Sequence, residues 1–424
     1  MGFLYQLGVK LYYFALLLAS PFHPKARQWI AGRKGWEKSL RKAVEKNKGE
    51  EAWIWFHAAS LGEFEQGRNL IEAIKTQYPH YRILLSFFSP SGYEVRKNYQ
   101  FADHVTYLPV DTVQNAKKFL DILNPTLIFF IKYELWLNFL AEVRNRKISA
   151  ILVSASVDRR SKFLTSPLAP QYKKAFGSFA AIFTQDTETV DLLGNFTGHP
   201  TIISSSDTRY DRVFANKQEF LALPEISTFK GGRFCLMGGS VWPPGEALLF
   251  EVFESLKDKD ICMILAPHEI EQGRIQQYVD RYPDISLRYS EKEKMNATHR
   301  ILWIDNIGML SRLYHYADVA YIGGGFRGKL HNVLEAVAFG CPVFWGPKDE
   351  NRPEAALLKD SGGGWSIETG DEMVEQMKPW MKTQSDLLDI HAANQRFVEE
   401  RKGATDQILS WCESKGLLQI PTSN

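Results

Sequence analysis

A glycine-rich run in the second half of the chain combines residue types that can hold a phosphate with residue types that can hold a sugar. It contains four glycines and then three polar side chains: Gly323, Gly324, Gly325, Gly328, His331, Asn332 and Glu335. Glycines let the backbone turn tightly and approach a ligand, and the free N–H groups of a following helix favour an anion. If that helix includes residues 331–335, His331 and Glu335 share one face. The run therefore predicts a nucleotide site, although Glu335 balancing His331 as a surface pair is an alternative.

Two other functions fit the same run. Gly323, Gly325 and Gly328 satisfy GxGxxG, and Asp349 or Glu350 follows the next expected strand, as in an NAD-dependent dehydrogenase. In that case Asp349 should face a ribose beside the loop. A noncatalytic nucleotide-binding scaffold is the third alternative. A Walker loop is excluded because Lys329 is followed by leucine.

A second candidate group, His57 to Glu63, follows the first strand expected after residue 49. Ser60 and Glu63 have capping-box spacing, in which Glu63 reaches back to the helix start. A glutamate in this position could equally be a general base that takes a proton from an attacking hydroxyl. A serine hydrolase is disfavoured because no GxSxG elbow surrounds any serine.

Other polar residues lie beside expected strand ends. Ser240 could donate to a phosphate or only cap a helix, and Arg209 could bind an anion bidentately or form a surface pair. Arg159 and Arg160 suit an anionic acceptor or simply solvent. No carboxylate pair in the sequence resembles a DxD metal site. We therefore expect metal-independent chemistry without a cofactor.

The elements that must position these residues alternate between short β-rich runs and helical segments, which indicates parallel sheets covered by helices. Ligands in such sheets collect beyond the carboxyl ends of the strands. The expected strands are 53–56, 83–88, 105–110, 127–131, 150–154 and 181–184, and then 234–237, 262–266, 301–304, 319–322 and 342–345. We expect two doubly wound domains at 49–215 and 233–387, joined by a linker at 216–232, with a C-terminal helix at 388–424 returning across the domains.

Composition agrees with two ordered domains. The chain has 424 residues, 45% of them hydrophobic and 13% aromatic, which suggests two domains of roughly 200 residues each. Four scattered cysteines without a CxxC pair favour a reducing compartment and no zinc site.

The N-terminal 48 residues differ from the rest. Residues 11–19 form an uninterrupted apolar run of nine residues, short of the ~20 that cross a bilayer. Residues 23–48 follow with nine Lys or Arg and two Glu, a local charge of +7, whereas the whole chain carries +2. We expect a helix at an anionic membrane surface, on the cytoplasmic side. A helix packed on the protein and a cleaved signal peptide are the alternatives, and nucleic-acid binding is disfavoured because the remaining residues are net acidic.

The motifs together resemble a family, the bacterial 3-deoxy-D-manno-octulosonic acid (Kdo) transferases of lipopolysaccharide assembly. Beyond the apolar N-terminus, the segments that carry the resemblance occur in the family's order: 57–63, 133–136, 153–156, 207–211, 239–240, 267–269, 306–310 and 331–335.

The resemblance implies a GT-B glycosyltransferase fold and inverting transfer of Kdo from CMP-Kdo to a lipid A precursor of the lipid IV-A type, at its 6′-hydroxyl. Glu63 would be the general base and Glu335 the ribose-binding carboxylate. The implied donor-binding residues are Ser240, Pro267, His268, Gly308, Met309, Gly324, Gly325, His331, Asn332 and Glu335. Candidate phosphate or acceptor contacts are Ser60, Glu134, Arg159, Arg160 and Arg209. The expected protein is a monomer at the cytoplasmic face of the inner membrane.

Overall fold

A computed structural model describes residues 3–47, 49, 52–349 and 352–419. The chain divides into two compact units: unit 1 is Met1–Asp211 with Lys402–Asn424, and unit 2 is Arg212–Arg401. Each unit is built on one seven-stranded sheet in which all paired strands are parallel. The expected α/β architecture with two doubly wound sheets is confirmed.

The sheet of unit 1 has the strand order β3-β2-β1-β4-β5-β6-β7. All six residues of β1 are buried, as expected for a central parallel strand covered on both faces. Trp53 and Trp55 enter the core on one face, whereas Ile54 and Phe56 enter the core on the other. The strands are β1 (Trp53–Ala58), β2 (Arg82–Phe87), β3 (His104–Tyr107), β4 (Leu127–Ile131), β5 (Ser149–Ala155), β6 (Ala181–Thr184) and β7 (Ile202–Ser204).

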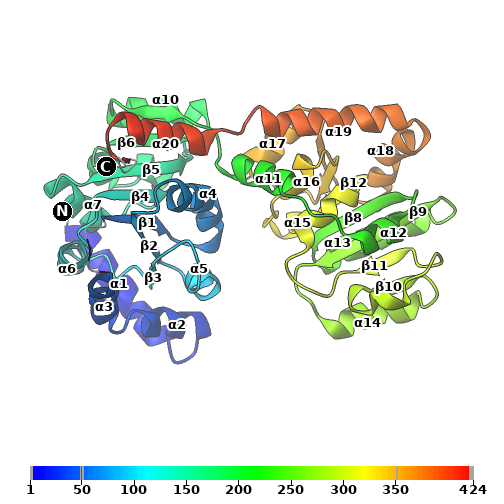
Figure 1. Cartoon of the computed structure of the whole chain (residues 1–424), viewed down its shortest axis with the longest axis horizontal. Coiled ribbons are helices and arrows are strands. Elements are labelled where there is room, and N and C mark those ends of the chain that lie inside the picture. Colours follow the sequence, from blue (N-terminus) through cyan, green and yellow to red (C-terminus); the bar gives the residue numbers. More distant parts are fainter. Residues whose placement is uncertain (1–2, 48, 50–51, 350–351, 420–424) are drawn as a thin grey trace. The chain divides into compact units, whose positions relative to one another are not determined.

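Helices cover both faces of this sheet. The last helix of the chain belongs here, because Ile408 and Leu409 share a core with Phe64 and Leu70 (α20, red in Figure 1). The helices are α1 (Phe3–Ala19), α2 (Pro24–Gly32), α3 (Trp36–Lys46), α4 (Leu61–Gln77), α5 (Pro90–Arg96), α6 (Val113–Leu123), α7 (Leu137–Asn145), α8 (Lys162–Thr165), α9 (Ala169–Phe176), α10 (Thr187–Thr197) and α20 (Ala404–Ser414).

The sheet of unit 2 has the order β10-β11-β9-β8-β12-β13-β14. Its strands are β8 (Phe234–Val241), β9 (Ile261–Pro267), β10 (Ser286–Arg288), β11 (Ile301–Trp303), β12 (Val319–Ile322), β13 (Val343–Trp345) and β14 (Gly364–Ser366). Its helices are α11 (Arg209–Gln218, which starts in unit 1), α12 (Pro224–Lys230), α13 (Pro243–Ser255), α14 (Gln272–Arg281), α15 (Leu310–Leu313), α16 (Leu334–Ala338), α17 (Pro353–Asp360), α18 (Gly370–Lys382) and α19 (Gln384–Glu399), with 3₁₀ turns at Tyr289–Lys294, Tyr314–Tyr316 and Gly325–Arg327.

The connections between the units differ from the expected ranges. The segment expected as a linker at 216–232 contains the end of α11 and all of α12. Pro224 is the first residue of α12, a position that proline favours. The expected returning helix at 388–424 is two helices, and the chain passes back to unit 1 at Lys402. Gly403, with φ of 108°, breaks the helix there.

Helix α1 has two different faces. Its inner face packs on the rest of unit 1. The Tyr5 hydroxyl donates to Asp111, and the Gln6 amide donates to Asn138 Oδ1 at 2.5 Å. Its outer face exposes Leu4, Leu11 and other apolar side chains. Among the described residues, no helix has the length and apolarity needed to cross a membrane.

Candidate active site

The expected site residues lie at the carboxyl ends of the strands in both units. In unit 1, Ser60 and Glu63 follow β1, and Glu134 follows β4, which pairs with β1 in the sheet. Because parallel strands end at the same edge, their loops are neighbours. The structure therefore brings Glu63 and Glu134 to one edge of the sheet.

Glu63 occupies the third position of α4. The backbone N–H of Ser60 donates to Glu63 Oε2 at 2.9 Å, and the Ser60 hydroxyl donates to the same oxygen at 3.3 Å. The predicted capping box is present. The contacts use one carboxylate oxygen and keep the side chain at the start of the helix.

Glu134 belongs to a buried polar cluster with His57 and Trp136. The Trp136 indole N–H is shared between Glu134 Oε2 at 2.6 Å and His57 Nε2 at 2.8 Å. His57 Nδ1 lies 3.1 Å from the Ser86 carbonyl and 2.8 Å from its hydroxyl. These contacts fix the position of Glu134 relative to β1.

The electrostatics of this edge suit a proton acceptor. Burial and the nearby negative charge of Glu134 raise the pKa of Glu63 to about 7, although the Ser60 hydrogen bonds and Lys132 oppose the shift. A carboxylate with this pKa is a far stronger base than an ordinary glutamate and is still substantially ionised at neutral pH. Glu63 can therefore be both a helix cap and a general base.

Three residues with a strained backbone lie at the same edge. Lys132, Ser154 and Ser206 have φ values of 69°, 56° and 69°, a conformation that is unfavourable for residues other than glycine. Ser154 lies in an irregular part of β5, and its hydroxyl is 3.0 Å from that of Thr208. The loops at this edge are thus held in specific shapes by contacts between strand ends.

Arg209 is held at this edge by the buried Asp207. Its Nη2 and Nε atoms donate to Asp207 Oδ2 at 2.7 and 2.9 Å, and the Gln185 side chain donates to the same oxygen at 2.8 Å. Arg209 and Glu63 both act electrostatically on Tyr133, whose pKa is raised to about 12, chiefly by burial. Arg209 therefore lies in the electrostatic neighbourhood of Glu63.

Arg159 and Arg160 are in a different environment. Both are exposed in the loop after β5. The Arg159 Nε atom is 3.9 Å from Glu188, and the Arg160 backbone N–H donates to Asp158. The structure places them outside the hydrogen-bonded groups around Glu134 and Asp207.

In unit 2, the glycine run packs closely against β8. A Cβ atom at Gly323 would overlap the Ser240 carbonyl, and one at Gly324 would overlap the Lys329 carbonyl. Gly324 also has φ of 95°, and Ser240 has φ of 49°. The glycines are therefore required by close backbone contact, and this contact brings Ser240 beside the loop.

Three rings lie together next to this loop. His268 stacks on Trp242 and on His331, each with a centroid distance of 4.4 Å. The Trp242 indole N–H donates to His331 Nε2 at 3.1 Å. Burial, followed by His268 and Arg352, lowers the pKa of His331 to about 4, so its ring is neutral at pH 7.

The positive charges near these rings come from arginines that the sequence analysis did not select. The Arg327 guanidinium lies 4.2 Å from the centroid of the Trp242 ring, and Arg352 acts electrostatically on His331. Arg327 lies between glycines of the glycine run, and this position is the one sequence signal that could have identified Arg327 as a site residue.

Pro267 and His268 lie where β9 ends. Pro267 is the last residue of that strand, and the His268 backbone N–H donates to the Val241 carbonyl at 2.8 Å. This hydrogen bond joins the end of β9 to the end of β8. It thereby holds the His268 ring at the same edge of the sheet as Trp242, the residue after Val241.

Asn332 and Glu335 form a separate pair beside the rings. The Asn332 amide donates to Glu335 Oε1 at 3.2 Å and accepts from the Leu334 backbone N–H at 3.2 Å. The expectation that His331 and Glu335 share a helical face is wrong, because α16 begins only at Leu334. Residues 328–333, which are neither helix nor strand, separate the 3₁₀ turn at Gly325–Arg327 from that helix.

Gly308 and Met309 lie at the start of α15, after β11. Gly308 has φ of 98°, which a side chain would disfavour. Met309 is buried, and its sulfur accepts from the Asn306 amide at 2.9 Å. This turn also belongs to the carboxyl-terminal edge of the unit 2 sheet.

The residue expected for dinucleotide binding is engaged elsewhere. Asp349 Oδ2 accepts from the Trp345 indole N–H at 2.6 Å and from Lys359 at 2.8 Å. Glu350, the other acidic candidate, lies outside the described residues. The Asp349 contacts disfavour the dehydrogenase alternative, because its carboxylate already has two partners.

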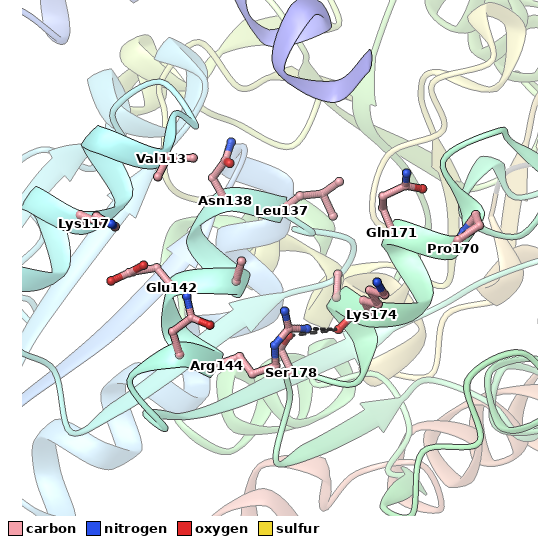
Figure 2. A pocket seen from close by; sticks show the side chains of 13 residues that line it. Val113, Lys117, Leu137, Asn138, Glu142, Arg144, Pro170, Gln171, Lys174 and Ser178 are labelled. Atoms are coloured by element: carbon pink, nitrogen blue, oxygen red, sulfur yellow. Dashed lines mark hydrogen bonds between the residues drawn. The ribbon is translucent and has the colours of Figure 1, made fainter. Parts of the chain in front are cut away.

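A groove in unit 1 is separate from the expected site residues. It has a volume of about 480 Å³ and lies between α6, α7 and α9, and none of the expected site residues lines it (Figure 2). Its cationic lining residues are Lys117, Arg144 and Lys174.

Within the part of the chain that the structure describes, no group of three His, Cys, Asp or Glu side chains could hold a metal ion.

Part of the chain matches a known family model, and most of it aligns with known proteins. Residues 33–212 match the family model described as 3-deoxy-D-manno-octulosonic-acid transferase (kdotransferase). The 3-deoxy-D-manno-octulosonic acid transferase of Rickettsia felis is 24% identical over 369 residues, which cover 84% of this chain and 78% of that protein. The enzyme of the same name from Haemophilus influenzae is 23% identical and covers 84% of this chain and 85% of its own length.

The chain is similar to Kdo transferases over most of its length. This similarity supports an enzyme of the glycosyltransferase class and disfavours the scaffold alternative.

Solved structures agree on the fold. UDP-GlcNAc 2-epimerase from Neisseria meningitidis matches with a TM-score of 0.60 and 12% identity, covering 85% of this chain and all of that one. A glycosyltransferase from Rickettsia africae matches with a TM-score of 0.54 and 11% identity, covering 86% and 99%. The likeness shows the GT-B type of α/β fold.

Proposed function

We propose that the protein transfers Kdo from CMP-Kdo to a lipid A precursor of the lipid IV-A type, with inversion at the anomeric carbon. Similarity to Kdo transferases supports the transferred sugar, and the acceptor and the base are our inference. The observation that carries the mechanism is Glu63, a carboxylate whose pKa is raised to about 7 by burial and Glu134.

In this mechanism Glu63 takes the proton of the acceptor hydroxyl as its oxygen attacks the anomeric carbon of Kdo. The bond between that carbon and the CMP phosphate breaks, and CMP leaves with the bonding electrons. A base near the operating pH is best suited to this proton transfer. Glu134 helps by keeping the pKa of Glu63 high, and the Ser60 hydrogen bonds keep its carboxylate in place.

We place the donor nucleotide on unit 2, beside the rings of Trp242, His268 and His331. The Glu335 carboxylate would accept from the ribose hydroxyls, and Ser240 and Asn332 would donate to the phosphate. Because His331 is neutral, the positive charge that stabilises the departing CMP would come from Arg327 and Arg352.

The decisive test is Glu63→Gln. Glutamine can still accept the hydrogen bond from the Ser60 N–H, so the helix cap is kept while the base is lost. We expect the turnover number on CMP-Kdo and the lipid A precursor to fall by about 10²- to 10⁴-fold, with an unchanged melting temperature. Near wild-type turnover would mean that Glu63 only caps α4.

We also propose that α1 attaches the protein to the cytoplasmic face of the inner membrane. Its outer stripe exposes Leu4 by 66%, Leu11 by 59%, Phe14 by 58% and Leu18 by 61%, at the spacing of one helical face. Such a stripe beside basic residues is typical of helices that lie in a membrane surface.

Vesicle flotation tests this attachment. The wild-type protein should bind anionic vesicles, whereas the triple variant Leu11→Ser, Phe14→Ser, Leu18→Ser should no longer bind them. Leu388→Ser, which changes an equally exposed leucine on α19, should bind as the wild-type protein does. Equal flotation of the triple variant and the wild-type protein would contradict the proposal.

A further inference from the structure

A pocket of about 530 Å³ opens between α1, α2 and the loop that follows β3. Its volume is within the range of about 300–1,000 Å³ that is usual for ligand sites. Val9, Tyr13 and Leu17 of α1 and Ile30 of α2 supply an apolar wall. The pocket can therefore accept a hydrocarbon group.

Among the described residues, three cations and no carboxylate line the same pocket. The cations are Lys10 on α1 and the adjacent Arg33 and Lys34 after α2. The nearest acidic residue in the lining loop, Asp111, is turned to α7, where it accepts from the backbone N–H groups of Asn138 and Phe139, each at 3.1 Å. The positive charge of the pocket is thus not balanced by its lining.

Arg33 is the distinctive group, because it is buried. It donates to the carbonyls of Leu108 at 2.8 Å, Trp29 at 3.1 Å and Phe88 at 2.7 Å, and its guanidinium lies 3.6 Å from the Trp29 ring centroid. Each of these carbonyls accepts one hydrogen bond from the guanidinium, but none carries a negative charge. Burial accordingly lowers the pKa of Arg33 to about 9. A buried cation that has only neutral partners is unfavourable, and an anion in the pocket would relieve that cost.

We propose that this pocket binds one anionic phospholipid, with its phosphate beside Arg33, Lys10 and Lys34 and its first acyl carbons along the apolar wall. The occupant must carry both a negative charge and a hydrocarbon part, because the pocket offers both surfaces. The inference rests on the proposed membrane attachment and goes beyond it, since attachment needs only the outer face of α1 and no saturable site.

We assign the pocket to a phospholipid and not to the acceptor lipid because of its place in the sheet. It adjoins β3 at the edge, and β2 separates β3 from β1, after which Glu63 follows. Two strand spacings amount to roughly 10 Å, so a phosphate beside Arg33 lies apart from the acceptor hydroxyl, which must be placed at Glu63.

Titration of the full-length protein with dihexanoyl phosphatidylglycerol, below the concentration at which it forms micelles, tests the site without a bilayer. Isothermal calorimetry should show one lipid per chain. The exposed pair Lys10→Ser, Lys34→Ser should weaken binding by about 30-fold. The matched control Lys117→Ser, Lys174→Ser, which removes two cations from the groove of Figure 2, should bind as the wild-type protein does.

Several results would overturn the proposal. Equal binding of dihexanoyl phosphatidylcholine, or equal weakening in both double variants, would reduce the effect to nonspecific attraction. If inorganic phosphate bound as tightly as the lipid, the apolar wall would contribute nothing to binding. Competitive displacement by the lipid A precursor would assign the pocket to the acceptor. Because the titration measures neither turnover nor vesicle binding, its failure is distinguishable from failure of the proposed function.

Discussion

At the scale of single residues, the central feature is a glutamate whose acidity depends on a second glutamate. Burial and the charge of Glu134 raise the pKa of Glu63 to about 7, and Glu134 itself is fixed by His57 and Trp136. The base must be ionised to accept a proton, so activity should rise with pH through about 7. The pH dependence of kcat/KM therefore reports on this pair.

Glu134→Gln should move the rising limb of the kcat/KM profile to lower pH. Removing the neighbouring charge lowers the pKa of Glu63, so more of it is ionised in acid. With a pKa near 7, only about one tenth of Glu63 is ionised at pH 6, and the variant should increase that fraction several-fold. Glu65→Gln, on the same helix but paired with Arg96 at 2.7 Å, should leave the limb in place. A limb that stays near pH 7 in Glu134→Gln would show that Glu134 does not tune the base.

The sequence could indicate Glu63 and Glu335 as candidate site residues but not the side chains that surround them. Ser60 and Glu63 are three residues apart, so the capping box follows from local spacing and is confirmed. The stack of Trp242, His268 and His331 joins three loops from different strands. Nothing in local spacing predicts that contact, because it depends on the order of β8, β9 and β12 in the sheet.

At the scale of elements, the strands predicted from apolar runs are present, and the missed ones share a physical cause. β7, β10 and β14 have three residues each and lie at the edges of their sheets. An edge strand pairs on one side only, so it needs no long apolar run. Ile202–Ser204 illustrates this, since all three of its residues retain some exposure to solvent.

Helix α20 offers a test of how the C-terminal segment is attached to unit 1. Asp211 accepts from the backbone N–H groups of Gly403 and Thr405, the latter at 2.7 Å, and from the Thr405 hydroxyl at 2.6 Å. We expect Asp211→Ala to lower the free energy of unfolding by about 1–2 kcal/mol, because the helix start loses its acceptor. Hydrogen exchange should show faster exchange in α20.

The control for this prediction is Asp406→Ala, which removes an exposed carboxylate from the first turn of the same helix. Its effect should be limited to the weaker interaction with the helix dipole, about 0.3–1 kcal/mol. If the two substitutions lower the free energy of unfolding by the same amount, the contacts of Asp211 do not hold α20.

At the scale of the whole molecule, the proposed base and the proposed donor site belong to different units. Glu63 is in unit 1, whereas Glu335 and the stacked rings are in unit 2. Each unit has its own sheet and its own core. Proton transfer and nucleotide binding should therefore be separable by substitution.

Glu335→Gln should weaken CMP binding by about 10- to 100-fold, because it removes the charge from the hydrogen bonds that we propose to the ribose hydroxyls. Glu63→Gln should bind CMP as the wild-type protein does, despite its low turnover. The double variant should have the CMP affinity of Glu335→Gln alone, since the proposed mechanism gives Glu63 no contact with CMP. Calorimetric titration with CMP measures all four proteins, and a loss of CMP affinity in Glu63→Gln would place that carboxylate at the nucleotide and contradict the division of roles between the units.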